Sequence, residues 1–508
     1  MNTIKAHAPA VFLAVLLEFI NPGAIAGGRT IGPGETKSEV IAALDSCIPD
    51  LMTKARIPGL SVALIWDGEV AWEKGYGTKN KRTGEPVDSR TVFEAASLTK
   101  PFFASLAMSL VDSGVIDLDK PLVEYVPQDS IESGLGHSFD YPGFRADWFR
   151  RITARMVLSH SSGLPHGDRR KPYPILFEPG TKFSYSADGY YLLQMAIQHL
   201  LREPLEETMK KRVIIPLHMD RSSMVWDDRF STNAAVGHSL LGITSGSPRK
   251  YTRADAAATL YTTAGDYAKF IAALMHGSFP GPRSVDLMLT PQINVTDSVS
   301  WSLGFGIEKT SGGVAFFQWG DYGIFRNYVV ALRGPRRALV YLTNSFFGLA
   351  IGKPLVSVAT GIKEDFGLRW LSYAPYDSET SMFFYAIGER PTEESVRLYQ
   401  DLRGKNSPAT GEDVMNAVGY ELLRSGAHDK ALVFFELNTK AYPGSANTYD
   451  SMGEACEKVG DLERAAVHYQ KALDALPNDT TRSEASKTRL KEIFQKNLAR
   501  VTVDKKPD

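Results

Sequence analysis

Apolar and polar residues follow two different periodicities along the chain, one helical and one typical of strands. In residues 38–55 apolar side chains recur at helical spacing, which predicts an amphipathic helix. Residues 61–76 instead predict two strands joined by Asp67 and Gly68, a pair that favours the tight turn of a β-hairpin. A helix beside an antiparallel sheet indicates an α+β layered fold. We therefore expect residues 30–370, which mix short strands and helices in this way, to form one domain.

The C-terminal region has a different pattern. Residues 371–410 are polar and rich in turn formers, which predicts a linker, and from residue 411 the helical periodicity dominates. Five residues recur after 34 positions: Gly419, Gly426, Ala431, Phe435 and Pro443 return as Gly453, Gly460, Ala465, Tyr469 and Pro477. This period is typical of tetratricopeptide repeats, whose small residues lie where paired helices touch. The prediction is an all-α repeat module over 411–498, followed by a disordered tail, 499–508.

The function of this module stays open between two interpretations. Stacked helix pairs form a groove that can take a partner peptide. The same helices can equally support the neighbouring domain or mediate self-association through residues 411–498.

The first residues have the pattern of a secretory signal. Lys5 precedes an apolar run, residues 9–20, and small residues at Ala24 and Ala26 give a cleavage pattern. The apolar run is too short to cross a bilayer of about 30 Å. Residues 1–26 are therefore predicted to be a signal peptide. We expect a periplasmic or secreted protein that has no stable membrane insertion after cleavage.

Composition narrows the class of protein. The 508 residues include 57 Lys and Arg against 58 Asp and Glu, so the chain lacks the basic excess that a nucleic-acid partner requires. Forty-three per cent hydrophobic and 23% charged residues are ordinary for a globular protein. Ten His and two Cys leave few ligands for structural zinc, and we predict neither metal nor cofactor. Whether Cys47 and Cys456 pair is left open.

One short motif carries candidate chemistry. Ser97 and Lys100 form S-x-x-K at the start of a helical pattern, residues 99–114. The i, i+3 spacing places the amine near the hydroxyl, and a serine needs such a neighbour to become a nucleophile. The positive end of the helix dipole also favours developing negative charge. The motif alone favours a capping serine beside a surface lysine, and a second copy at residues 247–250 lies in a Gly/Ser/Pro-rich turn.

Three segments favour the catalytic interpretation of Ser97 and Lys100. FEAASLTKPFF at 93–103, LSHSSGLP at 158–165 and KFSYSADGYY at 182–191 resemble the serine β-lactamase and penicillin-binding-protein superfamily. The resemblance is closest to the class C β-lactamases with their related esterases and D-amino-acid peptidases, and it covers residues 35–365. Further similar segments lie at 56–61, 260–266 and 303–306. The resemblance implies an antiparallel sheet flanked by helices, together with a helical subdomain.

The resemblance also implies roles for individual residues. Ser97 matches the nucleophile, Lys100 the neighbouring cation and Tyr185 the tyrosine of the Y-x-N motif. A tyrosine is a usable base only if a nearby ammonium stabilises its phenolate, which Lys100 would do. The family has a third motif, on a strand that binds substrate, and this motif aligns with Gln318, Trp319 and Gly320, which Asp321 follows. The backbone N–H groups of Ser97 and Asp321 would form an oxyanion hole.

The sequence departs from the family pattern at two positions. Ala187 replaces the asparagine of Y-x-N, and the adjacent Asp188 is expected to point elsewhere. Gln318 replaces the cation with which family members hold a substrate carboxylate, and Arg326 is the candidate replacement. His160 is expected to be a turn residue of LSHSSGLP. The loss of the cation favours esters or uncharged amides and predicts weak or no β-lactamase activity.

The functional prediction is an exported serine hydrolase that acts on a small molecule or peptide through an acyl-enzyme on Ser97. Two alternatives stay open: a non-catalytic binding protein that uses this scaffold and its helical repeats, and a penicillin-binding D-Ala-D-Ala carboxypeptidase.

Overall fold

The computed structural model describes residues 35–168, 171–364, 366–480 and 484–503. The chain divides into two compact units. One combines the chain up to residue 238 with residues 244–376, and the other combines residues 239–243 with the chain from residue 377 onwards. The predicted signal peptide, residues 1–26, lies outside the described residues.

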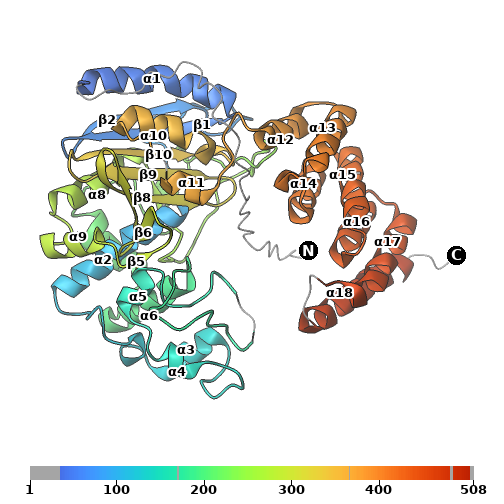
Figure 1. The fold of residues 1–508 in the computed structure, drawn as a ribbon, viewed down its shortest axis with the longest axis horizontal. Helices are drawn as coiled ribbons and strands as arrows, with labels where there is room; N and C mark the ends of the chain where they lie inside the picture. Colours follow the sequence, from blue (N-terminus) through green and yellow to red (C-terminus); the bar gives the residue numbers. More distant parts are fainter. Residues whose placement is uncertain (1–34, 169–170, 365, 481–483, 504–508) are drawn as a thin grey trace. The chain divides into compact units, whose positions relative to one another are not determined.

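The first unit is built on an antiparallel sheet of eight strands in the order β2-β1-β10-β9-β8-β7-β6-β5 (Figure 1). The predicted hairpin forms its first two strands, and Asp67 and Gly68 both adopt positive φ angles, 54° and 92°, in the turn between them. A separate pair of short strands consists of β3 (Phe93–Glu94), which comes directly before the Ser97 segment, and β4 (Tyr261–Thr262), which pairs with it. The sheet strands are β1 (Gly59–Trp66), β2 (Glu69–Gly77), β5 (Ile293–Asn294), β6 (Val299–Trp301), β7 (Gly306–Thr310), β8 (Gly313–Asp321), β9 (Arg326–Leu332) and β10 (Arg337–Thr343).

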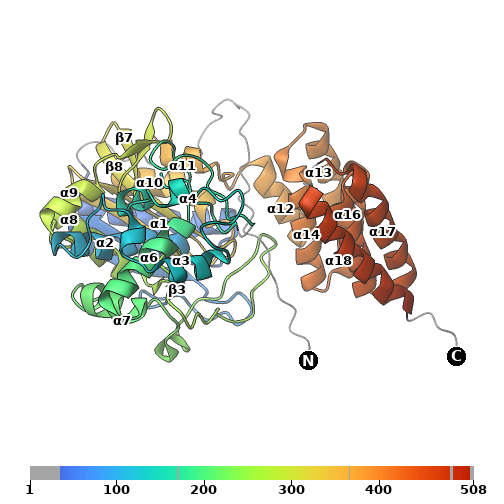
Figure 2. The ribbon, with the colours of Figure 1, turned by 90° about the horizontal axis from the view of Figure 1, so that it is seen from below.

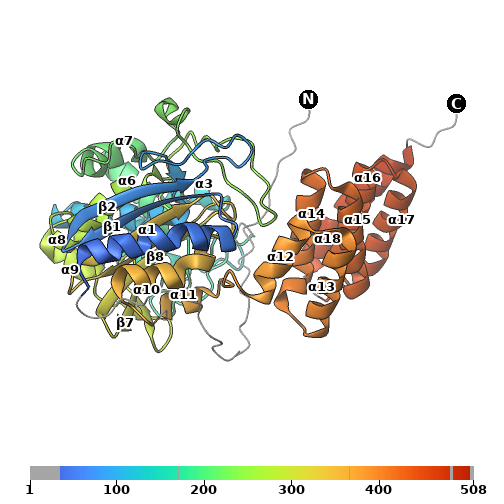
Figure 3. The ribbon, with the colours of Figure 1, turned by 90° about the horizontal axis from the view of Figure 1, so that it is seen from above.

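Helices cover both faces of this sheet. The predicted first helix, α1 (Lys37–Lys54), lies with α10 (Gly352–Thr360) over one face (Figure 3), and α8 (Ala264–His276) packs against β1, β2 and β10 from the other. Because both faces are covered, β1 is almost entirely buried and its sequence GLSVALIW is a nearly continuous apolar run. The helix that follows Ser97 is α2 (Thr99–Asp112).

A helical subdomain lies beside the sheet and confirms the predicted α+β architecture (Figure 1). Its largest helix, α6 (Asp188–Leu201), begins just after Tyr185. The other helices of the first unit are α3 (Gln128–Leu135), α4 (Ala146–Phe149), α5 (Ala154–Leu158), α7 (Leu205–Met209), α9 (Pro282–Met288) and α11 (Phe366–Leu371).

The second unit contains helices and no strand among its described residues (Figure 2). Both bounds of α16 and of α17 lie 34 residues after those of α14 and α15. A Cβ atom on Gly419 would lie 2.5 Å from the Phe435 ring, and one on Gly453 would lie 2.6 Å from the Tyr469 ring. The repeated glycine therefore makes room for the repeated aromatic ring, while the identification as tetratricopeptide repeats stays a prediction. The helices are α12 (Glu379–Glu389), α13 (Thr392–Gly404), α14 (Glu412–Arg424), α15 (His428–Ala441), α16 (Ala446–Lys458), α17 (Leu462–Ala475) and α18 (Glu484–Val503).

Two predicted boundaries differ from the structure. The expected linker, residues 371–410, contains α12 and α13, because Phe383, Phe384 and Tyr385 supply buried apolar surface for helix packing. The expected disordered tail from residue 499 is wrong for residues 499–503, which belong to α18, and its remaining residues lie outside the described part of the chain.

Cys47 lies in the first unit and Cys456 in the second, and both are free thiols. In the part of the chain that the structure describes, no helix combines the length and the apolar character needed to span a membrane.

Candidate active site

Ser97 lies in a tight 3₁₀ turn, η1 (Ala96–Leu98), that leads directly into α2. The preceding residue, Ala96, adopts a left-handed φ of 50°, which costs about 1–2 kcal/mol for a residue with a Cβ atom. The turn is held from outside by β8, because a Cβ atom on Gly320 would lie 2.2 Å from the Ala95 carbonyl oxygen. Strained backbone that is supported in this way is typical of functional sites. Gly320, one of the predicted substrate-binding residues, thus has its close contact with the turn that carries Ser97.

The side chains of Ser97 and Lys100 are in direct contact, as their spacing predicts. The Lys100 Nζ atom donates hydrogen bonds to Ser97 Oγ at 3.0 Å and to the Ala257 carbonyl at 2.9 Å. Lys100 is 1% exposed, and this burial lowers the pKa of its amine to about 7, with the Asp255 carboxylate acting in the opposite direction. A large fraction of Lys100 is therefore a neutral amine at neutral pH.

Tyr185 is joined to the same group by Gln318. The Gln318 Nε2 atom donates to the Tyr185 hydroxyl at 2.8 Å and to the Ser97 carbonyl at 3.1 Å. A further hydrogen bond links the Ser97 and Tyr185 side chains. Gln318 is fully buried, so this side chain positions the nucleophile and Tyr185, in place of the predicted contact with substrate.

The protonation state of Tyr185 differs from the prediction. Burial raises the pKa of Tyr185, and the hydrogen bonds from Ser97 and Gln318 only partly oppose this rise. The Lys100 Nζ atom lies 4.9 Å from the centroid of the Tyr185 ring, beside its π face. Burial lowers the pKa of the Lys100 amine to about 7, so it also disfavours the positive charge on which the predicted phenolate depends. Tyr185 is a protonated phenol here.

His160 supports Tyr185 from behind, a role that the sequence did not reveal. The two rings lie 4.2 Å apart between centroids. His160 Nδ1 accepts the N–H of Ser186 at 3.0 Å, and the His160 carbonyl accepts the N–H of Ser184 at 2.8 Å. Burial, with Lys100 nearby, lowers the pKa of His160 well below its usual range, so the ring is neutral. The φ of 55° confirms His160 as a turn residue of LSHSSGLP.

Trp319 and Asp321 extend the site along β8. The Trp319 ring lies 4.7 Å from the Tyr185 ring and is only 3% exposed, so it packs against Tyr185 from the interior of the protein. The Asp321 carboxylate accepts the Tyr373 hydroxyl at 2.5 Å and lies 3.1 Å from Arg326 Nε. These contacts hold the end of β8 in place.

The backbone N–H of Asp321 points away from β9. Tyr322 N donates to Phe325 O at 3.0 Å, so the adjacent pair in the ladder, Asp321 and Arg326, is a non-hydrogen-bonded pair. On the other side of β8, the ladder with β7 ends at Phe317. This N–H is therefore directed to the edge of β8 that β7 does not cover.

Neither Asp188, beside Ala187, nor Arg326, the candidate replacement for the cation lost at Gln318, restores the family pattern. Ala187 is the N-cap residue of α6, and the Asp188 carboxylate accepts the Tyr173 hydroxyl at 2.7 Å and the Gly167 N–H at 3.2 Å. The prediction that Asp188 points elsewhere is confirmed. Arg326 does not replace the lost cation, because it pairs with Asp321 and donates to the Phe346 carbonyl at 2.6 Å.

A second arginine near this region is also paired. Arg249 Nε donates to the Glu94 carboxylate at 2.8 Å, and the Glu94 side chain is almost fully buried. As for metals, the described residues contain no group of three or more His, Cys, Asp or Glu side chains placed to hold an ion.

Comparison with known proteins places this geometry in a family context. A family profile described as Beta-lactamase matches residues 44–354. Among curated relatives, Protein flp of Staphylococcus aureus (strain MRSA252) is 25% identical over 40% of this chain and 42% of its own length. Penicillin-binding protein 4 of Amycolatopsis lactamdurans is 24% identical over 37% of this chain and 50% of its own length. The matched segments thus span half or less of these relatives.

Solved structures show the same fold. A structure described as the octameric penicillin-binding protein homologue from Pyrococcus abyssi has a TM-score of 0.54 and 22% identity, covering 68% of this chain and 81% of that one. A structure described as D-alanine carboxypeptidase AmpC from Burkholderia cenocepacia has a TM-score of 0.53 and 18% identity, covering 64% of this chain and 99% of that one. At these identities the likeness concerns the fold alone.

Proposed function

Because this chain belongs to the beta-lactamase family, we propose that it is an exported serine hydrolase that cleaves ester or amide bonds through an acyl-enzyme on Ser97. The observation that carries the proposal is the 3.0 Å contact between the buried Lys100 amine and the Ser97 hydroxyl. A serine becomes a nucleophile when a neighbouring base accepts its proton, and a base works best when its pKa lies near the working pH. Lys100, with a pKa of about 7, meets that condition.

Acylation then proceeds in two steps. Neutral Lys100 takes the Ser97 proton while Ser97 Oγ bonds to the substrate carbonyl carbon, and the carbonyl electron pair moves to its oxygen. The backbone N–H groups of Ser97 and Asp321 donate to that oxygen, which is the largest electrostatic contribution in such reactions. The orientation of the Asp321 N–H, away from β9, supports this role.

The collapse of the tetrahedral intermediate formed by this addition releases the leaving group. The bond from the carbonyl carbon to the leaving atom breaks, and Tyr185 donates its phenolic proton to that atom. The Lys100 ammonium restores the Tyr185 proton, so the Ser97 proton has in effect reached the leaving group. In deacylation a water molecule gives a proton to neutral Lys100 and attacks the acyl carbon, and Ser97 Oγ departs with that proton. The hydrogen bond between Tyr185 and Ser97 supports the transfer.

The charges around the site support substrates that lack a carboxylate. Gln318 is neutral, and the charges of Arg326 and Arg249 are compensated by Asp321 and Glu94. β-Lactams and D-Ala-D-Ala peptides carry a carboxylate that such a site holds weakly. We therefore propose esters or uncharged amides as the substrate class, with weak or no β-lactamase activity.

Export and partners are further parts of this proposal. The sequence pattern of residues 1–26 supports cleavage of a signal peptide and release into the periplasm or the medium. The helix pairs of residues 411–498 support binding of a protein partner or self-association.

A serine-directed probe tests the catalytic proposal. The wild type, Ser97→Ala and Ser113→Ala are treated with a fluorophosphonate and analysed by intact-protein and peptide mass spectrometry. Ser113 is the matched control, because it is exposed and its hydroxyl donates to the Ser109 carbonyl at 3.0 Å. We expect labelling of Ser97 in the wild type and in Ser113→Ala, and none in Ser97→Ala. An unlabelled wild type would support the non-catalytic binding protein instead.

A further inference from the structure

A short segment beyond the region matched to the family contributes an aromatic side chain, Trp370, to the surroundings of the site. The family profile ends at residue 354, and α11 follows at Phe366–Leu371. Trp370 in this helix lies 5.6 Å from Trp319, 5.9 Å from Trp301 and 5.8 Å from Phe183, measured between ring centroids. Trp319 in turn lies 4.7 Å from Tyr185. Ring contacts thereby connect Trp370 through Trp319 to Tyr185.

The segment is anchored on both sides of Trp370. Before it, Gly367 N donates to the Glu308 carboxylate at 2.8 Å, and a Cβ atom on Gly367 would lie 2.8 Å from the Phe317 ring. After it, the Tyr373 hydroxyl donates to Asp321, the residue whose N–H is proposed for the oxyanion hole. The position of Trp370 relative to the site is therefore fixed before any substrate binds.

The aromatic rings of this cluster divide into two groups by exposure. Trp301 and Trp319 are buried, at 0% and 3% exposure, and support the others from behind. Phe183, Tyr185 and Trp370 are half-buried, as is Ser97. Phe183 and Trp370 meet edge-to-face, as do Tyr185 and Trp301. These rings are therefore held in place, and a further ring gains contact area at a low cost in side-chain entropy.

We propose that Phe183, Tyr185 and Trp370 form a subsite for an aromatic ring on the leaving-group side of the scissile bond. The side follows from Tyr185, which in the mechanism above donates its proton to the leaving atom and belongs to the same cluster. The preferred substrates are then esters or amides of aryl-bearing alcohols or amines that lack a carboxylate. This inference rests on the proposed function and specifies its substrate class.

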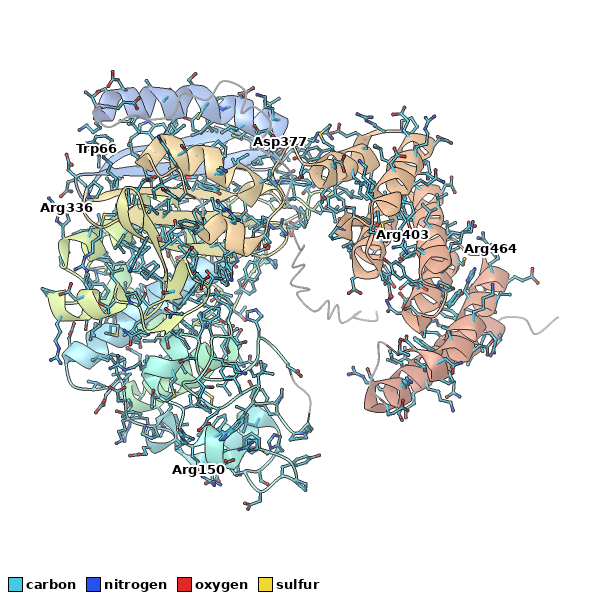
Figure 4. The ribbon with its side chains drawn as sticks, viewed as in Figure 1. Trp66, Arg150, Arg336, Asp377, Arg403 and Arg464 are labelled. Carbon is cyan, nitrogen blue, oxygen red and sulfur yellow. The ribbon has the colours of Figure 1, made fainter. Side chains whose placement is uncertain are left out.

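Three acetate esters test the subsite: benzyl acetate, cyclohexylmethyl acetate and propyl acetate. All three give the same acetyl-enzyme, so a difference in kcat/KM reports on binding and acylation and not on deacylation. Hydrolysis is followed by pH-stat for the wild type, Ser97→Ala, Trp370→Ala, Trp370→Phe and Trp66→Ala. Trp66 is the matched control, because it is a half-buried tryptophan whose ring faces Arg337 at 3.6 Å, close to Arg336 at the end of the sheet (Figure 4).

The measured quantity is the ratio of kcat/KM for the benzyl ester to that for the cyclohexylmethyl ester. This ratio does not depend on the fraction of folded enzyme, so a destabilised variant still gives an answer. We expect the wild-type ratio to exceed the Trp370→Ala ratio about 3- to 10-fold, as aromatic pairing predicts. Trp370→Phe and Trp66→Ala should keep most of the wild-type ratio, and propyl acetate should be the poorest substrate.

The possible failures are distinguishable. Ser97-dependent hydrolysis with the same ratio in wild type and Trp370→Ala would overturn the subsite and leave the proposed function standing. Esters that are not hydrolysed above the Ser97→Ala background would overturn the subsite, and if Ser97 also stays unlabelled by the fluorophosphonate, the proposed function is overturned with it. A ratio that falls equally in Trp66→Ala would also contradict the assignment to Trp370.

Discussion

The Gln318 amide donates to the Tyr185 hydroxyl at 2.8 Å and, from the same nitrogen, to the backbone carbonyl of Ser97 at 3.1 Å. At the position where family members carry a cation, this chain has a buried connector between the nucleophile and its neighbouring phenol. The Nε2 atom of Gln318 is therefore committed to the protein's own groups, Ser97 and Tyr185.

Removal of this connector should slow catalysis. In Gln318→Ala two hydrogen bonds are lost, each worth about 0.5–1.5 kcal/mol, which corresponds to a decrease of about 5- to 150-fold in kcat/KM. The rate of Ser97-dependent ester hydrolysis is the measurement. Gln128→Ala, on α3 with its amide bonded to Glu132, is the control and should keep the wild-type rate. An unchanged rate in Gln318→Ala would mean that the connector has no part in catalysis.

Activity should depend on pH through Lys100. The neutral amine is the proposed base and its pKa is about 7, so kcat/KM should rise as the pH increases through about 7 and then level off. The Asp255 carboxylate raises this pKa, so in Asp255→Asn the rise should move to lower pH. The pH profiles of wild type, Asp255→Asn and the exposed control Asp297→Asn provide the measurement. A shift of the Asp255→Asn profile to higher pH would contradict Lys100 as the base.

Positioning of Tyr185 should depend on His160. His160→Ala removes the ring contact and leaves the Ser186 N–H without its acceptor, so we expect a loss of about 2–4 kcal/mol in stability and a decrease in kcat larger than any change in KM. His160→Asn, which retains an acceptor, should recover part of kcat. Thermal melts and steady-state kinetics on the same samples separate the two effects. Equal kcat in all three proteins would show that Tyr185 needs no such support.

The neutral state of His160 also predicts sensitivity to acid. Its pKa is lowered in the folded state, while in the unfolded chain it lies near the ordinary value of about 6.5. Below that pH the unfolded state takes up a proton that the folded state resists, so His160 contributes less to stability as the pH falls. The decrease in Tm between pH 7 and pH 5 should therefore be smaller in His160→Asn than in the wild type. A decrease of the same size would contradict this contribution.

Gly320 should tolerate no side chain. Its Cβ atom would lie 2.2 Å from the Ala95 carbonyl, so Gly320→Ala must displace β8 or the turn before Ser97. We expect a destabilisation of about 1–3 kcal/mol together with loss of fluorophosphonate labelling at Ser97. Gly312→Ala is the control, because the contacts of its Cβ atom begin at 3.4 Å, and its melting and labelling should match the wild type.

The sequence alone determined the parts of this protein that rest on local spacing. The S-x-x-K spacing placed Lys100 beside Ser97, the Asp67-Gly68 pair gave the β1–β2 hairpin, and the 34-residue period appears again in the bounds of α14 to α17. Each follows from interactions between residues close in the chain or from a repeated unit, which a sequence pattern records directly.

Only the tertiary structure decided what surrounds these groups. The pKa of Lys100 near 7 and the protonated state of Tyr185 result from burial by segments far apart in the chain, so no local pattern contains them. The pairing of Arg326 with Asp321 across β8 and β9 likewise needed the register of the sheet. Trp370 joined the site because α11 folds back over β6 and β7, contacts that arise from long-range packing and that single positions do not encode.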